Sequence, residues 1–275
     1  MRGEGSGEGS DLKGKVAVVT SGKGGVGKST TTGHLGAALA RGGQKVALID
    51  ADIGLRNLDV VLGLEGRIVY DLIDVIEGLC GVEQAIIPSD DIPGLWLLPA
   101  SQSRRQDSVQ PGQMREVVAK LAERFDWVLI DCPAGVEQGF YNAVLCADVA
   151  IVVSTPDVSS VRDARKVLGL LSQEGKRDLR LIINRYDARM SKKGSAMTIG
   201  EMSALLPARI AGVIPDDAGA VAAANRGRPL RPEDGAAGAA FYRTARRLMG
   251  EDLDIPLSVR RKPAWWRLIW RNPAS

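Results

Sequence analysis

The sequence lacks several features on which whole classes of protein depend. It has one histidine, three cysteines without a CxxC pair, and no apolar run of about 18 residues, the length that spans a bilayer as a helix. These absences argue against a disulfide framework, a zinc or iron–sulfur site, and a transmembrane helix. The first ten residues, MRGEGSGEGS, contain no apolar stretch. We therefore expect residues 1–12 to be a disordered leader rather than a signal peptide, and we expect a reducing, cytoplasmic compartment.

The positive charge is concentrated at one end of the chain. The net charge is +3, but residues 258–275 alone hold five arginines and lysines and no acid, so the rest of the chain sums to −2. A nearly neutral body gives no support for the basic surface that a nucleic-acid-binding domain needs. We therefore expect no nucleic-acid partner.

Short apolar runs rich in β-branched residues alternate with helical patterns along the chain. Strands that are apolar on both faces and alternate with helices are typical of a mostly parallel, twisted sheet with helices on both sides. This pattern predicts a single α/β domain over residues 13–252. The expected strands are 15–20, 45–50, 94–99, 126–131, 147–155, 178–185 and 208–215, and the expected helices are 29–43, 111–125, 158–173 and 236–250.

The stretch SGKGGVGKST, residues 21–30, stands between the first expected strand and the first expected helix. Its glycine, lysine and serine spacing matches the phosphate loop, in which backbone N–H groups surround a polyphosphate. Lys28 would neutralise the β- and γ-phosphates, and the Ser29 hydroxyl would bind Mg²⁺. The sequence therefore predicts a P-loop NTPase with ATP and Mg²⁺ as cofactors. The expected nucleotide contacts in the loop are Gly22, Lys23, Gly24, Gly25, Val26, Gly27, Lys28, Ser29 and Thr30.

Acidic residues follow two of the expected strands. Asp131 ends the strand DWVLID, and Asp50 ends KVALID with Asp52 close behind. Ligands gather at the carboxyl ends of such strands, so these carboxylates can serve Mg²⁺ and the attacking water separately, or they are ordinary capping and turn acids. His34 lies on the helix after the loop and is expected to pack there rather than to act as a base.

The loop carries a second lysine, Lys23, five positions before Lys28. In this respect it resembles the deviant Walker A ATPases, the ParA/MinD family, which includes DNA-partitioning ATPases and the nitrogenase iron protein. The resemblance implies that Lys23 crosses a dimer interface to reach the phosphates bound by the partner chain. A cation supplied in this way would couple ATP occupancy to formation of a homodimer and would assist phosphoryl transfer.

Further segments resemble the septum-positioning branch of that family, in consistent order from about residue 13 to the C-terminus. These segments are 50–78, 97–104, 131–139, 159–169, 183–189 and 212–217. The resemblance implies that Asp52 orients the attacking water, so that the catalytic residues are Lys23, Lys28 and Asp52. It implies that Ser29, Asp50 and Asp131 lie at the metal. Gly54, Arg56 and Asn57 would form the first switch with Asp52, Asp131 would open the second switch, and Asn184, Pro215 and Asp216 would border the adenine.

One residue of the second switch departs from the family pattern. Cys132 stands where a small polar residue is expected. We interpret it as a tolerated small side chain rather than a redox-sensitive thiol.

The C-terminal tail has the pattern of an interfacial membrane helix. At about 100° per residue its apolar side chains share one broad arc and its arginines point the other way, while Pro263 can start the helix and Pro273 can follow its end. Residues 253–275 are therefore predicted to be a linker and an amphipathic helix that binds anionic membrane. The residues on the two faces are Trp265, Trp266, Leu268, Ile269 and Trp270, with Arg267 and Arg271 opposite.

The resemblance implies an ATPase that dimerises on ATP, binds the inner face of the cell membrane and positions the division septum. It also implies a MinC-like division inhibitor and a MinE-like activator as partners. A flagellar-placement ATPase of the same branch and a ParA-type DNA-partitioning ATPase remain alternatives. A cluster-carrying ATPase is disfavoured by the missing cysteine pairs, and a scaffold without turnover by the retained Lys23, Lys28, Asp52 and Asp131.

Overall fold

The computed structural model describes residues 14–54, 56–102, 109–133, 135–136 and 138–255. The predicted leader, and all seven residues predicted to contact the membrane, lie outside these ranges. Within them no helix is both long enough and apolar enough to cross a bilayer.

The described residues form an eight-stranded sheet with the order β3-β4-β2-β5-β1-β6-β7-β8. All neighbouring strands run parallel except β3 and β4, which are antiparallel. The seven expected strands are confirmed within one or two residues at each end; only β3 was missed. The bounds are β1 Lys15–Thr20, β2 Val46–Asp50, β3 Ile87–Pro88, β4 Leu95–Leu98, β5 Trp127–Asp131, β6 Val149–Ser154, β7 Asp178–Tyr186 and β8 Arg209–Pro215.

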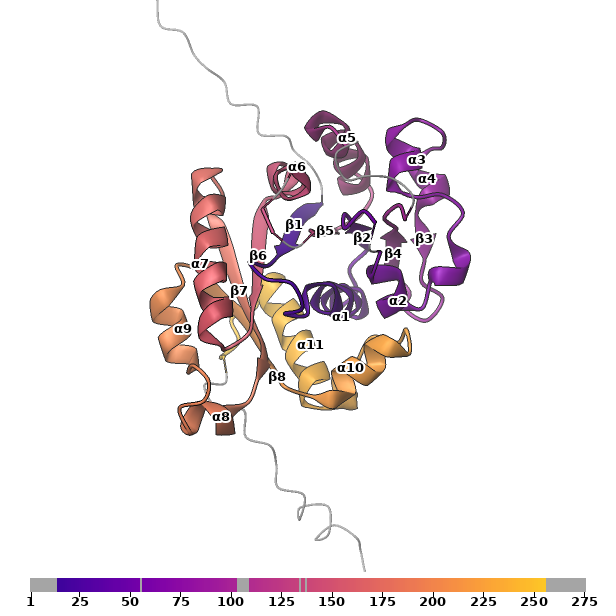
Figure 1. Ribbon diagram of the computed structural model, residues 1–275. Coiled ribbons are helices and arrows are strands. Elements are labelled where there is room, and N and C mark those ends of the chain that lie inside the picture. Colours follow the sequence, from indigo (N-terminus) through magenta and orange to yellow (C-terminus); the bar gives the residue numbers. More distant parts are fainter. Residues whose placement is uncertain (1–13, 55, 103–108, 134, 137, 256–275) are drawn as a thin grey trace, which may run out of the picture.

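Helices cover both faces of this sheet, as the sequence predicts (Figure 1). The four expected helices are present as α1 Lys28–Arg41, α5 Pro111–Ala122, α7 Val158–Gln173 and α11 Ala236–Leu248. Shorter helices lie in segments for which no element was expected. They are α2 Leu58–Leu62, α3 Leu72–Ile76, α4 Val82–Ala85, α6 Gln138–Cys146, α8 Ala188–Lys192, α9 Ile199–Leu205 and α10 Ala218–Asn225.

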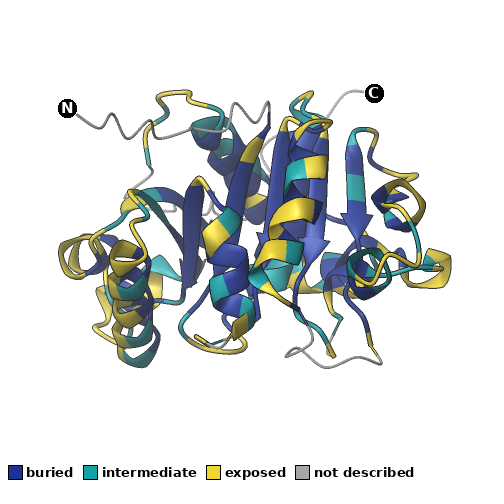
Figure 2. Cartoon of the chain, turned by 90° about the horizontal axis from the view of Figure 1, so that it is seen from above, coloured by how far each residue is buried: buried dark blue, intermediate teal, exposed yellow. Residues whose placement is uncertain are grey.

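The sheet separates two hydrophobic cores, because successive side chains of a strand point to opposite faces. In β1, Val16 and Val18 pack in the core beneath α5, α6 and α7, whereas Ala17 and Val19 pack beneath α1 and α11. Burial on both faces explains why the strands are continuous apolar runs in the sequence. Figure 2 shows the buried strands between helices whose outer faces are exposed.

The parallel register brings the ends of three central strands together. Val19 near the end of β1 pairs with Asp131 of β5, and Asp131 in turn pairs with Asp50 of β2. The phosphate-loop segment, residues 21–27, leaves β1 at this same edge and enters α1. The polar residues predicted from three separate segments therefore meet at one place.

Candidate nucleotide-binding site

The loop between β1 and α1 has a backbone that only glycine adopts easily at two of its positions. Gly25 and Gly27 have φ angles of 77° and 89°. A Cβ on Gly27 would lie 2.5 Å from Nδ2 of Asn184, and that amide donates a hydrogen bond of 2.8 Å to the Val26 carbonyl. Asn184, predicted to border the adenine, therefore also supports the loop from β7.

Lys28 is buried in the first turn of α1 and points at the second-switch carboxylate. Its Nζ donates to Oδ1 of Asp131 at 3.1 Å, and the Thr32 hydroxyl donates to the same oxygen at 2.9 Å. Burial alone would lower the pKa of Lys28. The charge of Asp131, its hydrogen bond and the charge of Asp52 outweigh that effect, so the pKa lies above its ordinary value. The ammonium is therefore permanently charged where a polyphosphate would lie.

The donor set fits a hydrated Mg²⁺ ion beside a polyphosphate. Oδ2 of Asp131 is fully buried and has no hydrogen-bond partner among the described residues. Ser29 follows Lys28 directly, with its Oγ 3.5 Å from the Lys28 Nζ. A hydroxyl and a carboxylate beside a phosphate are the ligands that Mg²⁺ takes in such sites, with water completing the octahedron.

The side chain of Asp50 holds the backbone of the segment predicted to be the first switch. One of its oxygens accepts from the Asp52 N–H at 3.0 Å, and the other accepts from the N–H groups of Asn57 and Leu58 at 3.2 and 3.1 Å. Burial and the neighbouring charge of Asp131 raise the pKa of Asp50 to about 7. Its predicted place near Mg²⁺ stays a prediction, and the structure adds this second task to it.

Asp52 is a second carboxylate in the site that is available for another partner. It is half-buried, and no group of the described chain donates a hydrogen bond to its side chain. The rest of the switch turns sharply, with φ angles of 97° at Gly54 and 40° at Arg56, and Nε of Arg56 lies 2.7 Å from Asp59. Asn57 begins α2 without a side-chain cap.

Lys23 occupies a very different environment from Lys28. Its Nζ donates to the Ser159 hydroxyl at 3.0 Å and lies 3.9 Å from Oδ1 of Asp157, at the start of α7. Asp157 caps that helix by accepting from the Ser160 N–H. Partial burial raises the pKa of Asp157, but hydrogen bonds from Thr155 and Ser159 outweigh this effect and lower the pKa to about 2. Lys23 is therefore docked within its own chain on a permanently ionised carboxylate.

The residues predicted for the second switch and the adenine border lie at the ends of β5, β7 and β8. Cys132 is fully buried, and burial raises the pKa of its thiol to about 12, so it packs as a neutral side chain. Pro215 pairs with Tyr186 across β7 and β8, and the Asp216 N–H donates to the Tyr186 carbonyl at 3.1 Å. Asn184, Pro215 and Asp216 thus gather at the ends of two adjacent strands.

His34 is a packed residue rather than part of the site. Its Nδ1 donates to the Thr30 carbonyl at 2.9 Å, and its ring lies 4.9 Å from that of Phe241 on α11. Burial lowers the pKa of His34 to about 4, so the ring is neutral.

Sequence reasoning missed the residues that hold the two lysines. Thr32 lies one helical turn after Lys28, a spacing that places both side chains on one face of α1. Asp157 and Ser159 belong to an N-cap signature, DVSS, that is visible at the start of the expected helix. Their contacts with a loop more than 100 residues away were not.

Comparison with known proteins agrees with this geometry. The family of the CobQ/CobB/MinD/ParA nucleotide binding domain matches residues 17–230. The chain is 48% identical to the septum site-determining protein MinD of Synechocystis sp. over 241 residues, which cover 87% of this chain and 91% of the relative. It is 47% identical to the MinD of Bacillus subtilis over 251 residues, which cover 90% of this chain and 92% of the relative.

Solved structures give the same result. The MinC:MinD cell division protein complex of Aquifex aeolicus contains a chain that matches with a TM-score of 0.82 and 45% identity, covering 88% of this chain and 98% of that one. The septum site-determining protein MinD of Pyrococcus horikoshii, complexed with Mg-ADP, matches with a TM-score of 0.77 and 29% identity. The match covers 86% of this chain and 96% of that one. The chain therefore belongs to the MinD family of septum site-determining proteins and is a nucleotide-binding ATP hydrolase of cell division.

Proposed function

We propose that this chain is an ATP-dependent membrane switch: it dimerises when loaded with Mg²⁺ and ATP, binds anionic membrane through its tail, and leaves the membrane after hydrolysis. The observation that carries the proposal is the contrast between a buried Lys28, already aimed into the site, and an exposed Lys23 that no buried contact holds. The loop has one lysine for its own nucleotide and a second, held only by exposed contacts, that can move to serve a partner.

Each binding role follows from the position of a residue. The loop amides of residues 22–30 and the Lys28 ammonium would hold the phosphates. Ser29 and the unpartnered oxygen of Asp131 would hold Mg²⁺, with Asp50 behind them. The bound metal would neutralise charge on the phosphates. Asn184, Pro215 and Asp216 would border the adenine.

Asp52 is our candidate for orienting the attacking water. Its side chain has no hydrogen-bond donor in the described chain, and burial raises its pKa above the ordinary value although the charge of nearby Lys28 acts in the opposite direction. A carboxylate with a raised pKa is a better acceptor for the proton of the attacking water. A carboxylate held by Asp50 through its own backbone N–H is fixed in place while both its oxygens stay available. Hydrolysis would then depend on water placed by Asp52 and on charge supplied by Lys28 and Lys23.

Lys23 must leave Ser159 and Asp157 to reach a partner chain. The side chains of Lys23 and Asp157 are 48% and 51% exposed, and an ion pair at that exposure is worth at most about 1 kcal/mol. The docked position is therefore a weak resting place. Val136 in the second switch and Val158 at the start of α7 are also exposed, at 43% and 75%, and would be covered when two chains associate.

The membrane half of the proposal rests on the sequence pattern of residues 253–275. One short helix binds lipid weakly and reversibly, whereas two helices joined in a dimer gain an effective concentration that strengthens binding by about 10² or more. Dimerisation alone can thus switch membrane attachment. The corresponding domain division is a leader at 1–12, an ATPase domain at 13–252 and a linker and helix after it.

Partner proteins follow from the relatives. An Aquifex MinD is solved in a complex with MinC, and its similarity to this chain supports a MinC-like inhibitor as partner. A MinE-like activator and a place on the inner face of the membrane complete the scheme. Flagellar placement is the second candidate function, since it would use the same ATPase and tail; a ParA-type role on DNA is the third.

The test combines turnover with vesicle binding. We expect low basal ATP hydrolysis, stimulation by anionic vesicles, and co-sedimentation with vesicles in a non-hydrolysable ATP analogue but not in ADP. Lys23→Ala should lose the stimulation, whereas Lys120→Ala, which removes an exposed lysine from α5, should keep it. Equal vesicle binding in ADP and in the analogue would contradict the switch, and full binding after deletion of residues 258–275 would contradict the role of the tail.

A further inference from the structure

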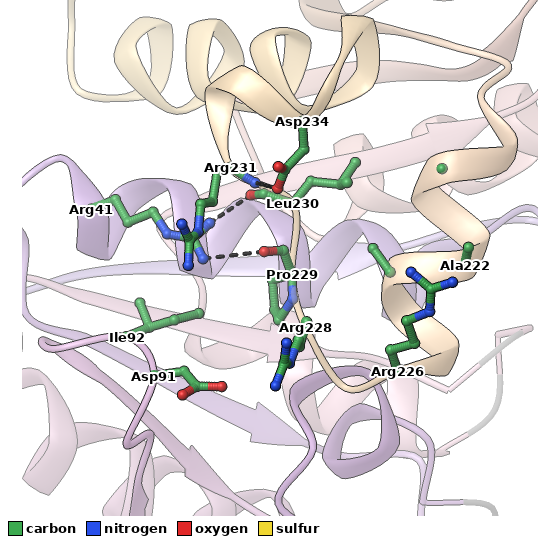
Figure 3. A pocket seen from close by; sticks show the side chains of 12 residues that line it. Arg41, Asp91, Ile92, Ala222, Arg226, Arg228, Pro229, Leu230, Arg231 and Asp234 are labelled. Atoms are coloured by element: carbon green, nitrogen blue, oxygen red, sulfur yellow. Dashed lines mark hydrogen bonds between the residues drawn. The ribbon is translucent and has the colours of Figure 1, made fainter.

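A concave, arginine-lined pocket lies far from the phosphate loop. It has a volume of about 570 Å³ and is formed by the end of α1, by α10 and the segment that follows it, and by the turn before β4 (Figure 3). Arg41, at its wall, is the last residue of α1, whereas Lys28 is the first. A helix of that length separates the two by roughly 20 Å, so the pocket is not an extension of the nucleotide site.

The pocket carries more positive charge than its own acids neutralise. Four arginines and two aspartates line it, which leaves an excess of two positive charges. The acids are Asp91 and Asp234. The Asp234 carboxylate accepts a hydrogen bond from the backbone N–H of Arg231, not from its guanidinium. Burial and the neighbouring charge of Arg231 lower the pKa of Arg41, and this lowering outweighs the opposite effect of the carboxylates of Asp234, Glu233 and Asp91.

Three of the arginines are free to bind a ligand. Arg226, Arg228 and Arg231 are exposed, and none of them has an ion pair or a side-chain hydrogen bond within the described chain. Arg41 is different, because its guanidinium donates to the carbonyls of Pro229 and Leu230, which fixes the segment that carries Arg228 and Arg231 (Figure 3). The pocket thus has a built wall and three uncommitted charged donors.

We propose that this pocket binds the phosphate group of a small phosphomonoester. A phosphomonoester is a dianion near neutral pH, so it matches the excess of two charges, and arginine donors recognise phosphate through paired hydrogen bonds. The volume accommodates the esterified part of a small molecule as well as its phosphate. Lipid headgroups such as phosphatidylglycerol are phosphodiesters with a single charge, and a bilayer presents a surface rather than a molecule that enters a pocket.

The test measures glucose 6-phosphate binding to the full chain by calorimetry, with Mg²⁺ and saturating ADP present so that the phosphate loop is filled. Glucose is the uncharged control, and glycerophosphoglycerol is the phosphodiester control. We expect saturable binding of glucose 6-phosphate at one site per chain, at least tenfold tighter than either control.

Two variants locate the site. Arg228→Gln with Arg231→Gln should weaken glucose 6-phosphate binding by about tenfold or more, because charge-assisted hydrogen bonds are lost. Arg226→Gln alone should weaken it less. Arg115→Gln with Lys120→Gln removes the same charge from α5 and should change binding less than twofold. Basal ATP hydrolysis and the melting temperature should match the parent in all three, which shows that the variants are folded.

In the calorimetric experiments, three results would overturn the proposal: no saturable binding of glucose 6-phosphate, an equal loss in the α5 variant, or tighter binding of the phosphodiester. Reduced vesicle binding by the Arg228 and Arg231 variant, with glucose 6-phosphate affinity unchanged, would likewise assign the pocket to lipid and reject a small phosphomonoester.

Discussion

Lys28 and Lys23 lie in one loop, five residues apart, yet their surroundings differ in almost every respect. The Lys28 side chain is 8% exposed and its ammonium contacts an Asp131 that is fully buried, whereas Lys23 and its partner Asp157 are about half exposed. A buried ion pair is costly to break because one charge is left unpaired, while an exposed pair rearranges at little cost. The comparison separates a fixed lysine from a movable one.

The largest expected effect is that of Lys28→Ala. The substitution leaves Asp131 buried without its partner, and we expect a loss of about 3–5 kcal/mol from the free energy of unfolding of the nucleotide-free protein. ATP turnover should fall by roughly 100-fold or more. Denaturant melts and phosphate release measure the two effects. A double variant with Asp131→Asn should lose less stability than the two single losses combined; strict additivity would show that the pair is not coupled.

His34 is buried on the same helix as Lys28, so its titration tests how much a buried charge on α1 costs. Its pKa is about 4 in the folded protein, and the unfolded value is 6.5, so between these values the unfolded chain binds more protons. The stability contribution is complete above about pH 6.5 and falls by about 3 kcal/mol as the pH drops to 4. In His34→Asn this component should disappear from melts recorded across that range. If the variant lost the same stability between about pH 6.5 and 4, the assignment of that loss to His34 would be wrong.

Lys23→Ala tests the exposed side. We expect the free energy of unfolding to change by less than about 0.5 kcal/mol, because an exposed pair contributes little. Vesicle-stimulated hydrolysis should nevertheless fall by about tenfold or more, because in the proposed function the lost cation would act at another chain's phosphates. Melts and turnover measured on the same preparation compare it directly with Lys28→Ala. A clear loss of stability without loss of stimulation would reverse the assignment of the two lysines.

Asp157 offers the finest test. Asp157→Ala removes the cap of α7 and should cost about 1 kcal/mol of unfolding free energy, whereas Asp157→Asn retains an accepting oxygen and should cost less. Both variants remove the charge beside Lys23. If Asn were as destabilising as Ala, the charge on Asp157, rather than its capping hydrogen bond, would be the stabilising feature.

Much of the fold could be predicted because the strands are buried on both faces and appear as uninterrupted apolar runs. β3 was missed since it is two residues long and ends in Pro88, and α2, α8 and α9 were missed since helices of five to seven residues show too few turns for a period to appear. The all-around apolar composition of α10, AGAVAAAN, likewise has no periodic contrast.

The site also has a part that the sequence predicts and a part that it does not. The phosphate loop and the aspartates at the ends of β2 and β5 were recognisable, because the spacing of glycine, lysine and serine and the place of an acid after an apolar run are local properties. The packing of Asn184 against Gly27, the hold of Asp50 on the first switch and the docking of Lys23 on Ser159 were not. Each joins residues through the folded chain, and no local pattern records which partner they meet.

Local order in the chain was thus enough to establish a nucleotide-binding α/β protein with two lysines in one loop. That one lysine is buried and committed while the other is exposed and lightly held came only with the packed sheet, since burial and long-range contact set how much a charge costs to move. The four arginines around the pocket at the far end of α1 are scattered over nearly 200 residues, and only the folding of α1 against the segment after α10 brings them together.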